Sequence, residues 1–114
     1  MGYACSPEPV TRAFTHLNSK IYVPMQGPSE LGASGKLLNW DRTADLAKIN
    51  VPALVIAGRY DTMEPAWVEK MSKLLPNGRF LLCPNGSHMS MYDDQKTYFD
   101  GLIRFLGDVD AGRH

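Results

Sequence analysis

The sequence lacks any long apolar run. Its longest uninterrupted one extends from Ala53 to Ala57, far short of the roughly 20 residues that a membrane-spanning helix needs. The residues from Met1 to Pro9 also lack the basic start and apolar stretch of a signal peptide. These absences predict a soluble, cytoplasmic protein that has no membrane partner.

Net charge is absent as well, because 12 Lys and Arg residues balance 12 Asp and Glu residues. Such a chain has no long-range field that would attract nucleic acid. Cysteine is scarce, and Cys5 and Cys83 lie far apart in the sequence. Two such cysteines favour reduced thiols over a disulfide framework. The sequence therefore predicts no nucleic-acid partner and no disulfide scaffold.

What the sequence does contain is enough apolar material for a core, since 44% of its 114 residues are hydrophobic. The rest of the chain is organised around the stretch from Val51 to Pro65. It contains a strand that begins after Pro52, stops at Gly58 and places Asp61 on the turn that follows. The strand is apolar without alternation, which is typical of a parallel strand covered on both faces.

A helix and a second strand are predicted after Asp61. Pro65 suits the first position of a helix, and Arg79 to Cys83 form a second short apolar strand that Pro84 ends. The helix has an apolar stripe of residues four, seven and eight apart: Trp67, Met71, Leu74 and Leu75. Strand, helix and strand with such short connections predict a βαβ unit with parallel strands and a right-handed crossover.

Shorter elements precede this unit. We predict a helix from about Pro9 to Leu17 and a second one from Ser19 to Met25, with Ser19 as its N-cap. Residues 27–39 are rich in glycine and proline, which predicts an irregular segment, and residues 40–46 predict a helical turn.

A final helix is predicted from about Asp93, where Asp93 and Asp94 would cap its start. Its apolar residues are predicted to lie on one side: Tyr98, Phe99, Leu102, Ile103 and Leu106.

Two chemically active side chains follow the two predicted strands. Asp61 comes after the first strand and His88 after the second. The carboxyl ends of parallel strands meet at one edge of a sheet, where open α/β sheets build their sites. We therefore predict that Asp61 and His88 lie side by side, as the orienting half of a catalytic triad.

Two other interpretations stay open for these residues. Asp61 could only cap the helix that begins near Pro65, and His88 could only be a loop residue. A metal site made of His88, Asp93 and Asp94 would lack further ligands, so we expect no metal and no cofactor.

Three motifs resemble the C-terminal part of a proline iminopeptidase, an α/β-hydrolase-fold serine aminopeptidase, and its tricorn-interacting relatives. The motifs are Gly58-Arg59-Tyr60-Asp61, Ser87-His88-Met89-Ser90-Met91 and Met25-Gln26-Gly27-Pro28-Ser29-Glu30. The resemblance extends from about Pro7 to Leu106. It implies an α/β fold in which residues 1–39 are the end of a helical cap and a return loop. Residues 40–114 are then the C-terminal part of the hydrolase core, a βαβ unit followed by a terminal helix.

The same resemblance implies roles for three residues. Asp61 is the acid and His88 the base of a Ser-Asp-His triad, and Glu30 holds the free α-amino group of a short peptide. Glu30 could also be only a solvated loop carboxylate. Some relatives carry a second acidic residue directly after the triad aspartate, where this chain has Thr62, so its amine recognition should be tuned differently.

The nucleophile of such a triad is missing from the sequence. The hydrolase order places a Gly-x-Ser-x-Gly elbow before the acid, and this chain contains none; neither Ser29 nor Ser34 fits the spacing. The glycine-rich oxyanion loop is absent too. Two parallel strands cannot complete a sheet. The chain therefore reads as a C-terminal fragment, inactive by itself, whether a proteolytic remnant, a truncated gene product or one piece of a split enzyme.

Two further functions remain open. The first is a non-catalytic interaction module, in which an unpaired sheet edge binds a second copy or a complementary chain that carries the nucleophile. The second is a fragment of a hydrolase of other specificity, an amidase or esterase, because those enzymes share the Asp and His loops.

Overall fold

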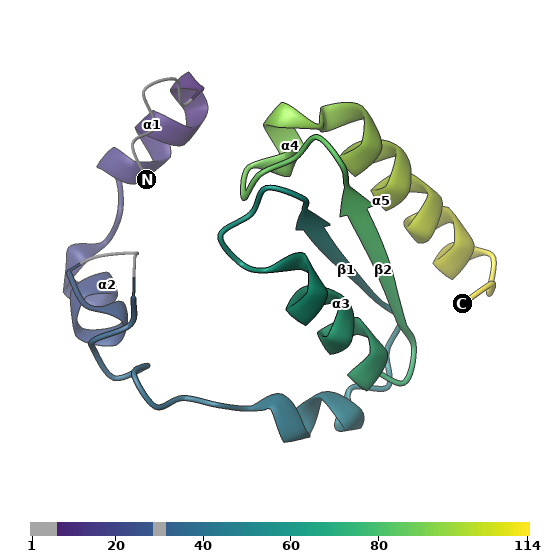
Figure 1. Ribbon diagram of the computed structural model, residues 1–114, viewed down its shortest axis with the longest axis horizontal. Coiled ribbons are helices and arrows are strands. Elements are labelled where there is room, and N and C mark those ends of the chain that lie inside the picture. Colours follow the sequence, from purple (N-terminus) through teal and green to yellow (C-terminus); the bar gives the residue numbers. More distant parts are fainter. Residues whose placement is uncertain (1–6, 29–31) are drawn as a thin grey trace. The chain divides into compact units, whose positions relative to one another are not determined.

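The computed structural model describes residues 7–28 and 32–114 (Figure 1). The chain divides into two compact units, Met1–Asp41 and Arg42–His114. The second unit contains both strands, and the first contains two short helices.

The first unit begins with helix α1 (Glu8–Thr15), which ends two residues before the predicted end, and continues with α2 (Ser19–Gln26). Val10 is the buried residue of α1. The N-cap of α2 is Asn18 rather than the predicted Ser19, because the Asn18 side chain accepts a hydrogen bond from the Lys20 amide at 3.2 Å. Asn18 thus satisfies one of the free amides of the first turn.

The described residues between 27 and 42 form no helix or strand, as the glycine and proline content predicts. Gly27 has a φ of 106°, which favours glycine. The amides of Ser34 and Gly35 donate back to the Gln26 carbonyl oxygen at 2.8 and 3.2 Å. The segment therefore turns back on the end of α2.

The second unit opens with a 3₁₀ helix, η1 (Thr43–Lys48), which begins later than the helical turn predicted for residues 40–46. Asp45 lies between Arg42 at 2.6 Å and Lys48 at 2.7 Å on this helix. These exposed ion pairs contribute little to stability individually.

A parallel βαβ unit follows, as predicted. Strand β1 (Ala53–Gly58) pairs in register with β2 (Gly78–Cys83), and helix α3 (Pro65–Leu74) connects them with Pro65 in its first turn. Figure 1 shows α3 on one side of the strand pair and the last helix, α5 (Gln95–Asp110), on the other. The two strands thus have helical cover on both faces.

The apolar stripe predicted for α3 is only partly covered. Trp67 is 64% exposed, and Met71 and Leu74 are also exposed, whereas Ser72 and Leu75 are buried. The Lys70 ammonium lies over the Trp67 ring, with its nitrogen 4.8 Å from the ring centroid. The small Ser72 is therefore covered on this helix, whereas the Trp67 indole is not.

The last helical segment consists of two helices instead of one. A short helix, α4 (Ser90–Asp93), is separated from α5 by Asp94 alone. Asp94 occupies the N-cap position of α5, as predicted, but its side chain makes no capping bond, and Asp93 ends α4 instead of capping α5. Both carboxylates make hydrogen bonds elsewhere.

The apolar face predicted for α5 is only partly correct. Tyr98 and Leu102 are half-buried, but Ile103 is 65% exposed, and Phe99 and Leu106 are exposed too. The helix packs through Phe105, which is buried, and through Gly101, which lies against the Leu81 side chain. A second apolar stripe therefore faces solvent in this chain.

Within the residues that the structure describes, β1 and β2 form a two-stranded sheet, so each strand has one unpaired edge. Ile49 and Val51, just before β1, are also exposed. Among residues 7–28 and 32–114, no helix is long and apolar enough to cross a membrane.

Candidate active site

The turn after β1 carries Asp61 and is tied to the loop after β2. The Tyr60 amide donates to the Gly86 carbonyl oxygen at 2.9 Å, and the Arg59 amide donates to that of Cys83 at 2.9 Å. Gly58 makes this approach feasible, because a Cβ there would lie 2.2 Å from the Ser87 carbonyl oxygen. The two loops are therefore joined at the carboxyl edge of the sheet.

The Asp61 carboxylate is held by its own turn. Its Oδ1 accepts a hydrogen bond from the Met63 amide at 2.9 Å, an Asx-type turn. The N-cap of α3 is Glu64, so Asp61 does not cap this helix, and that interpretation is wrong. The Asp61 side chain is only 9% exposed.

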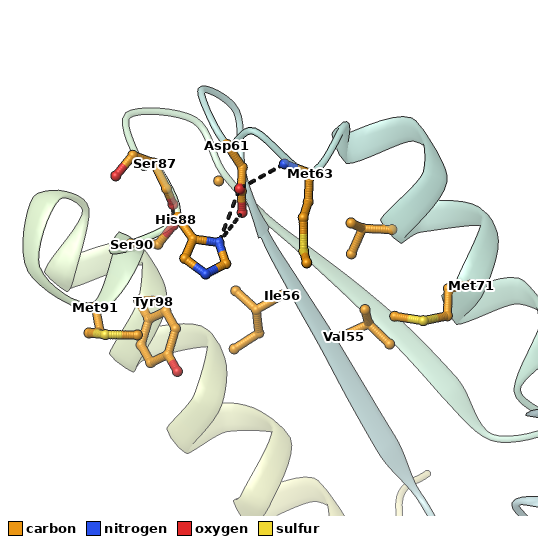
Figure 2. Close-up of a pocket in the computed structure, with 12 residues that line it drawn as sticks. Val55, Ile56, Asp61, Met63, Met71, Ser87, His88, Ser90, Met91 and Tyr98 are labelled. Atoms are coloured by element: carbon orange, nitrogen blue, oxygen red, sulfur yellow. Dashed lines mark hydrogen bonds and ion pairs between the residues drawn. The ribbon is translucent and has the colours of Figure 1, made fainter. Parts of the chain in front are cut away.

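His88 lies against this carboxylate (Figure 2). Its Nδ1 is 3.1 Å from Asp61 Oδ1 and 3.2 Å from Oδ2. The predicted proximity of Asp61 and His88 is thus confirmed, while their catalytic role stays a prediction. The His88 side chain is 44% exposed, and its second ring nitrogen points away from Asp61 (Figure 2). An imidazole held in this way keeps one nitrogen available for proton transfer.

A groove of about 260 Å³ adjoins the pair. It is lined on both sides of β1, by Val55 with Met71 of α3 and by Ile56 with Tyr98 of α5 (Figure 2). Successive residues of a strand point to opposite faces, so the groove passes along the unpaired edge of β1. It is largely apolar, with the Asp61 and His88 pair at the carboxyl end of the strand.

The two serines beside His88 are occupied. The Ser87 hydroxyl donates to Asp93 and accepts from the Met89 amide, and the Ser90 hydroxyl donates to the Ser87 carbonyl oxygen at 2.6 Å. Both hydroxyls therefore serve the local loop, and neither is placed as a nucleophile that His88 would activate.

Sequence reasoning missed the role of Asp93 and Asp94 in this loop. Asp93 accepts from the Ser87 amide at 3.1 and 3.2 Å, and Asp94 accepts from the Asn85 amide at 3.0 Å. The position of both acids a few residues after a glycine-containing loop was the available signal, since loop amides need acceptors. Their place at a predicted helix start favoured capping instead.

Cys83 lies beneath the same loop and is fully buried with a free thiol. Burial, together with the nearby Asp94 carboxylate, raises the pKa of the Cys83 thiol. A buried thiol with a raised pKa is a poor nucleophile, so Cys83 acts as a packing residue. Cys5 lies outside the described residues.

Glu30, the predicted amine-binding residue, also lies outside the described residues. Over the part of the chain that the structure covers, no group of three or more His, Cys, Asp or Glu side chains is placed to hold a metal ion.

Comparison with known proteins now adds to this geometry. The sequence is 50% identical over 103 residues to the proline iminopeptidase of Flavobacterium johnsoniae and 51% identical over 107 residues to that of Elizabethkingia meningoseptica. These matches cover 90% and 92% of this chain. The chain is homologous to part of a proline iminopeptidase. It spans only 35% and 36% of the length of these two relatives, and no protein-family model matches it.

Two solved structures also resemble this chain. The crystal structure of VinJ matches with a TM-score of 0.84 at 27% identity, over 92% of this chain and 36% of that one. A proline iminopeptidase structure from Mycobacterium smegmatis matches with a TM-score of 0.87 at 23% identity, over 97% of this chain and 38% of that one. The chain thus has the architecture of one part of an α/β-hydrolase fold.

Proposed function

We propose that this chain supplies the acid and the base of a serine aminopeptidase that releases N-terminal proline from short peptides. The observation that carries the proposal is the contact between His88 Nδ1 and Asp61 Oδ1 at 3.1 Å, at the carboxyl edge of a parallel strand pair. The names of the relatives supply the substrate class.

In this mechanism His88 transfers a proton, and Asp61 orients the His88 imidazole. The Nδ1–H of His88 donates to Asp61, so that the other ring nitrogen accepts the proton of a serine hydroxyl as its oxygen attacks the first carbonyl of the peptide. The imidazolium then gives this proton to the leaving amine, and Asp61 stabilises the positive charge in between. Water repeats the sequence to release the acyl group.

The serine has to come from a segment that this sequence does not contain. The groove along the unpaired edge of β1 fits a further strand of that segment, because it is apolar on both sides of β1 and ends at the Asp61 and His88 pair. The partner is therefore a hydrolase segment that carries the nucleophile and the oxyanion donors. Without that segment, we expect the chain to be inactive.

Specificity for a free N-terminus is assigned to Glu30. Its carboxylate would pair with the α-amino group of the substrate. Thr62 stands where an acid would strengthen this field, and its hydroxyl is 3.5 Å from Asp61 Oδ1. A cytoplasmic location completes the proposal and rests on the sequence alone.

A chimera tests the proposal. The 103-residue segment of the F. johnsoniae relative that matches this chain is replaced by the chain itself, and hydrolysis of a proline arylamide is compared with that of its N-acetylated form and of a simple ester. We expect the chimera to cleave the free-amine substrate, and the isolated 114-residue chain to cleave none. Glu30→Ala should raise KM for the free-amine substrate.

A chimera that folds and cleaves only the acetylated amide or the ester would refute the aminopeptidase assignment and favour an amidase or esterase. Proline release by the purified isolated chain, with contaminating peptidases excluded, would refute its dependence on another segment.

A further inference from the structure

The backbone around His88 is held by a carboxylate that takes no part in the triad. Ser87 precedes His88, and its amide donates to both carboxylate oxygens of Asp93, at 3.1 and 3.2 Å. The Ser87 hydroxyl donates to the same carboxylate. Hydrogen bonds to an ionised acceptor are about twice as strong as neutral ones, so this is a firm attachment for an exposed loop.

The residue after His88 is attached to the same carboxylate. The Met89 amide donates to Ser87 Oγ at 3.1 Å, and the same hydroxyl donates a hydrogen bond to the Asp93 carboxylate. The amides before and after His88 therefore converge on Asp93, one directly and one through the Ser87 hydroxyl. The Cα of His88 is fixed from both sides.

The rest of the loop is clamped in other ways. Asp94, only 8% exposed, accepts from the Asn85 amide at 3.0 Å. A Cβ on Gly86 would lie 2.5 Å from Ser90 Oγ and 2.9 Å from Cys83 Cβ, so the loop lies tightly over the end of β2. With the start of the loop clamped in this way, the remaining freedom is around Ser87 and His88, where Asp93 acts.

We infer that Asp93 is a positioning residue for His88, acting through Ser87, and that the site divides its work between two carboxylates. Asp61 holds the imidazole ring, and Asp93 holds the backbone that carries it. The inference deepens the proposed function and rests on it for the meaning of the His88 geometry. The hydrogen bonds themselves do not depend on that function.

The test is nuclear magnetic resonance of the full 114-residue chain with ¹⁵N-labelled histidine. The readout is the exchange rate of the His88 Nδ1 proton with water, with its signal assigned through His88→Gln. In the unmodified chain we expect slow exchange and ring nitrogen shifts that differ from those of the exposed His16. Asp93→Ala should accelerate the exchange by about tenfold or more, since Ser87 loses its hydrogen bonds to a charged carboxylate and the His88 backbone is no longer held.

Three further variants make the result specific. Asp93→Asn keeps an oxygen for the Ser87 amide and should retain much of the protection. Ser87→Ala removes only the bridging hydroxyl and should give an exchange rate between those of Asp93→Ala and Asp93→Asn. Asp110→Ala, an exposed acid of α5, is the matched control and should change nothing.

An exchange rate within about twofold of the original in Asp93→Ala, with the amide signals of β1 and β2 retained, would overturn the inference. If Asp93→Ala does not fold, unchanged exchange in both Asp93→Asn and Ser87→Ala overturns it, and faster exchange in Ser87→Ala supports it. Asp61→Asn separates the two proposals. A His88 signal that is unmoved by Asp61→Asn contradicts the triad, whatever Asp93 does.

Discussion

At the scale of single residues, aspartates that look alike in the sequence make different contacts in the structure. Asp61 contacts the His88 ring, and Asp93 holds the backbone beside His88. Asp108 of α5 forms an ion pair with Arg79 of β2. The sequence alone predicts the first, because Asp61 follows an apolar strand. The position of Asp93 shortly after a glycine-containing loop is only a weak signal for the second, because the contact depends on how the helix breaks at Asp94.

Asp108 predicts how stability depends on pH. Hydrogen bonds from Arg79 and Arg113 lower the pKa of Asp108 below its ordinary value. Because the folded chain favours the carboxylate, this contribution is present above the ordinary pKa and is lost as pH falls through the lowered one. Asp108→Asn should therefore lower the urea midpoint at neutral pH and leave it less sensitive to acid.

The comparison for Asp108→Asn is Asp110→Asn, on the exposed end of the same helix. Equal acid sensitivity in both variants would show that the Arg79 pairing does not contribute to stability.

Cys83 gives a prediction of chemical reactivity. Because burial raises the pKa of its thiol, the thiolate should be scarce in the folded chain, and alkylation should become fast only after unfolding. Mass spectrometry of peptides after brief treatment with iodoacetamide, in buffer and in urea, measures this. Cys83 labelled as fast in buffer as in urea would contradict its buried position.

At the scale of elements, a proline that begins a helix and a glycine that ends a strand are the reliable signals. Pro65 in the first turn of α3 and Gly58 at the end of β1 predict the βαβ unit correctly, because each restricts the backbone locally. The orientation of the helices could not be predicted in the same way. Both α3 and α5 carry more apolar residues than one face needs, and packing decides which of them is covered.

Two glycines test this reading of the elements. Gly58→Ala should destabilise the chain by about 1–3 kcal/mol, because the new Cβ would lie 2.2 Å from a backbone oxygen of the histidine loop. Gly107→Ala in α5 meets nothing within 4 Å and should stabilise it by about 0.5–1 kcal/mol. Urea unfolding measures both, and the same sign for both changes would contradict the packing described.

At the scale of the whole molecule, the described residues place the Asp61 and His88 pair on a two-stranded sheet whose outer edges are unpaired. The chain's resemblance to proline iminopeptidases could be read from three short motifs, whereas the share of the relatives that it spans, 35–36%, came from comparison. The structure adds an unpaired edge on β1, within the described residues, beside an apolar groove.

The unpaired edge predicts the behaviour of the isolated chain in solution. Apolar side chains exposed on both α3 and α5, together with an open strand edge, should drive association that increases with concentration. Sedimentation velocity over a wide concentration range measures this. A compact monomer at every concentration would argue against the docking of a further segment at this edge.

The most direct test of the account is the turnover of a proline arylamide by the chimera carrying Asp61→Asn. The account predicts that kcat falls by roughly 10³–10⁴-fold while KM changes little, because the substitution leaves the shape of the site intact and removes the group that orients His88. His88→Ala should fall by a similar factor, and the two losses should not add. A correctly folded Asp61→Asn chimera with kcat within about tenfold of the original would contradict the account.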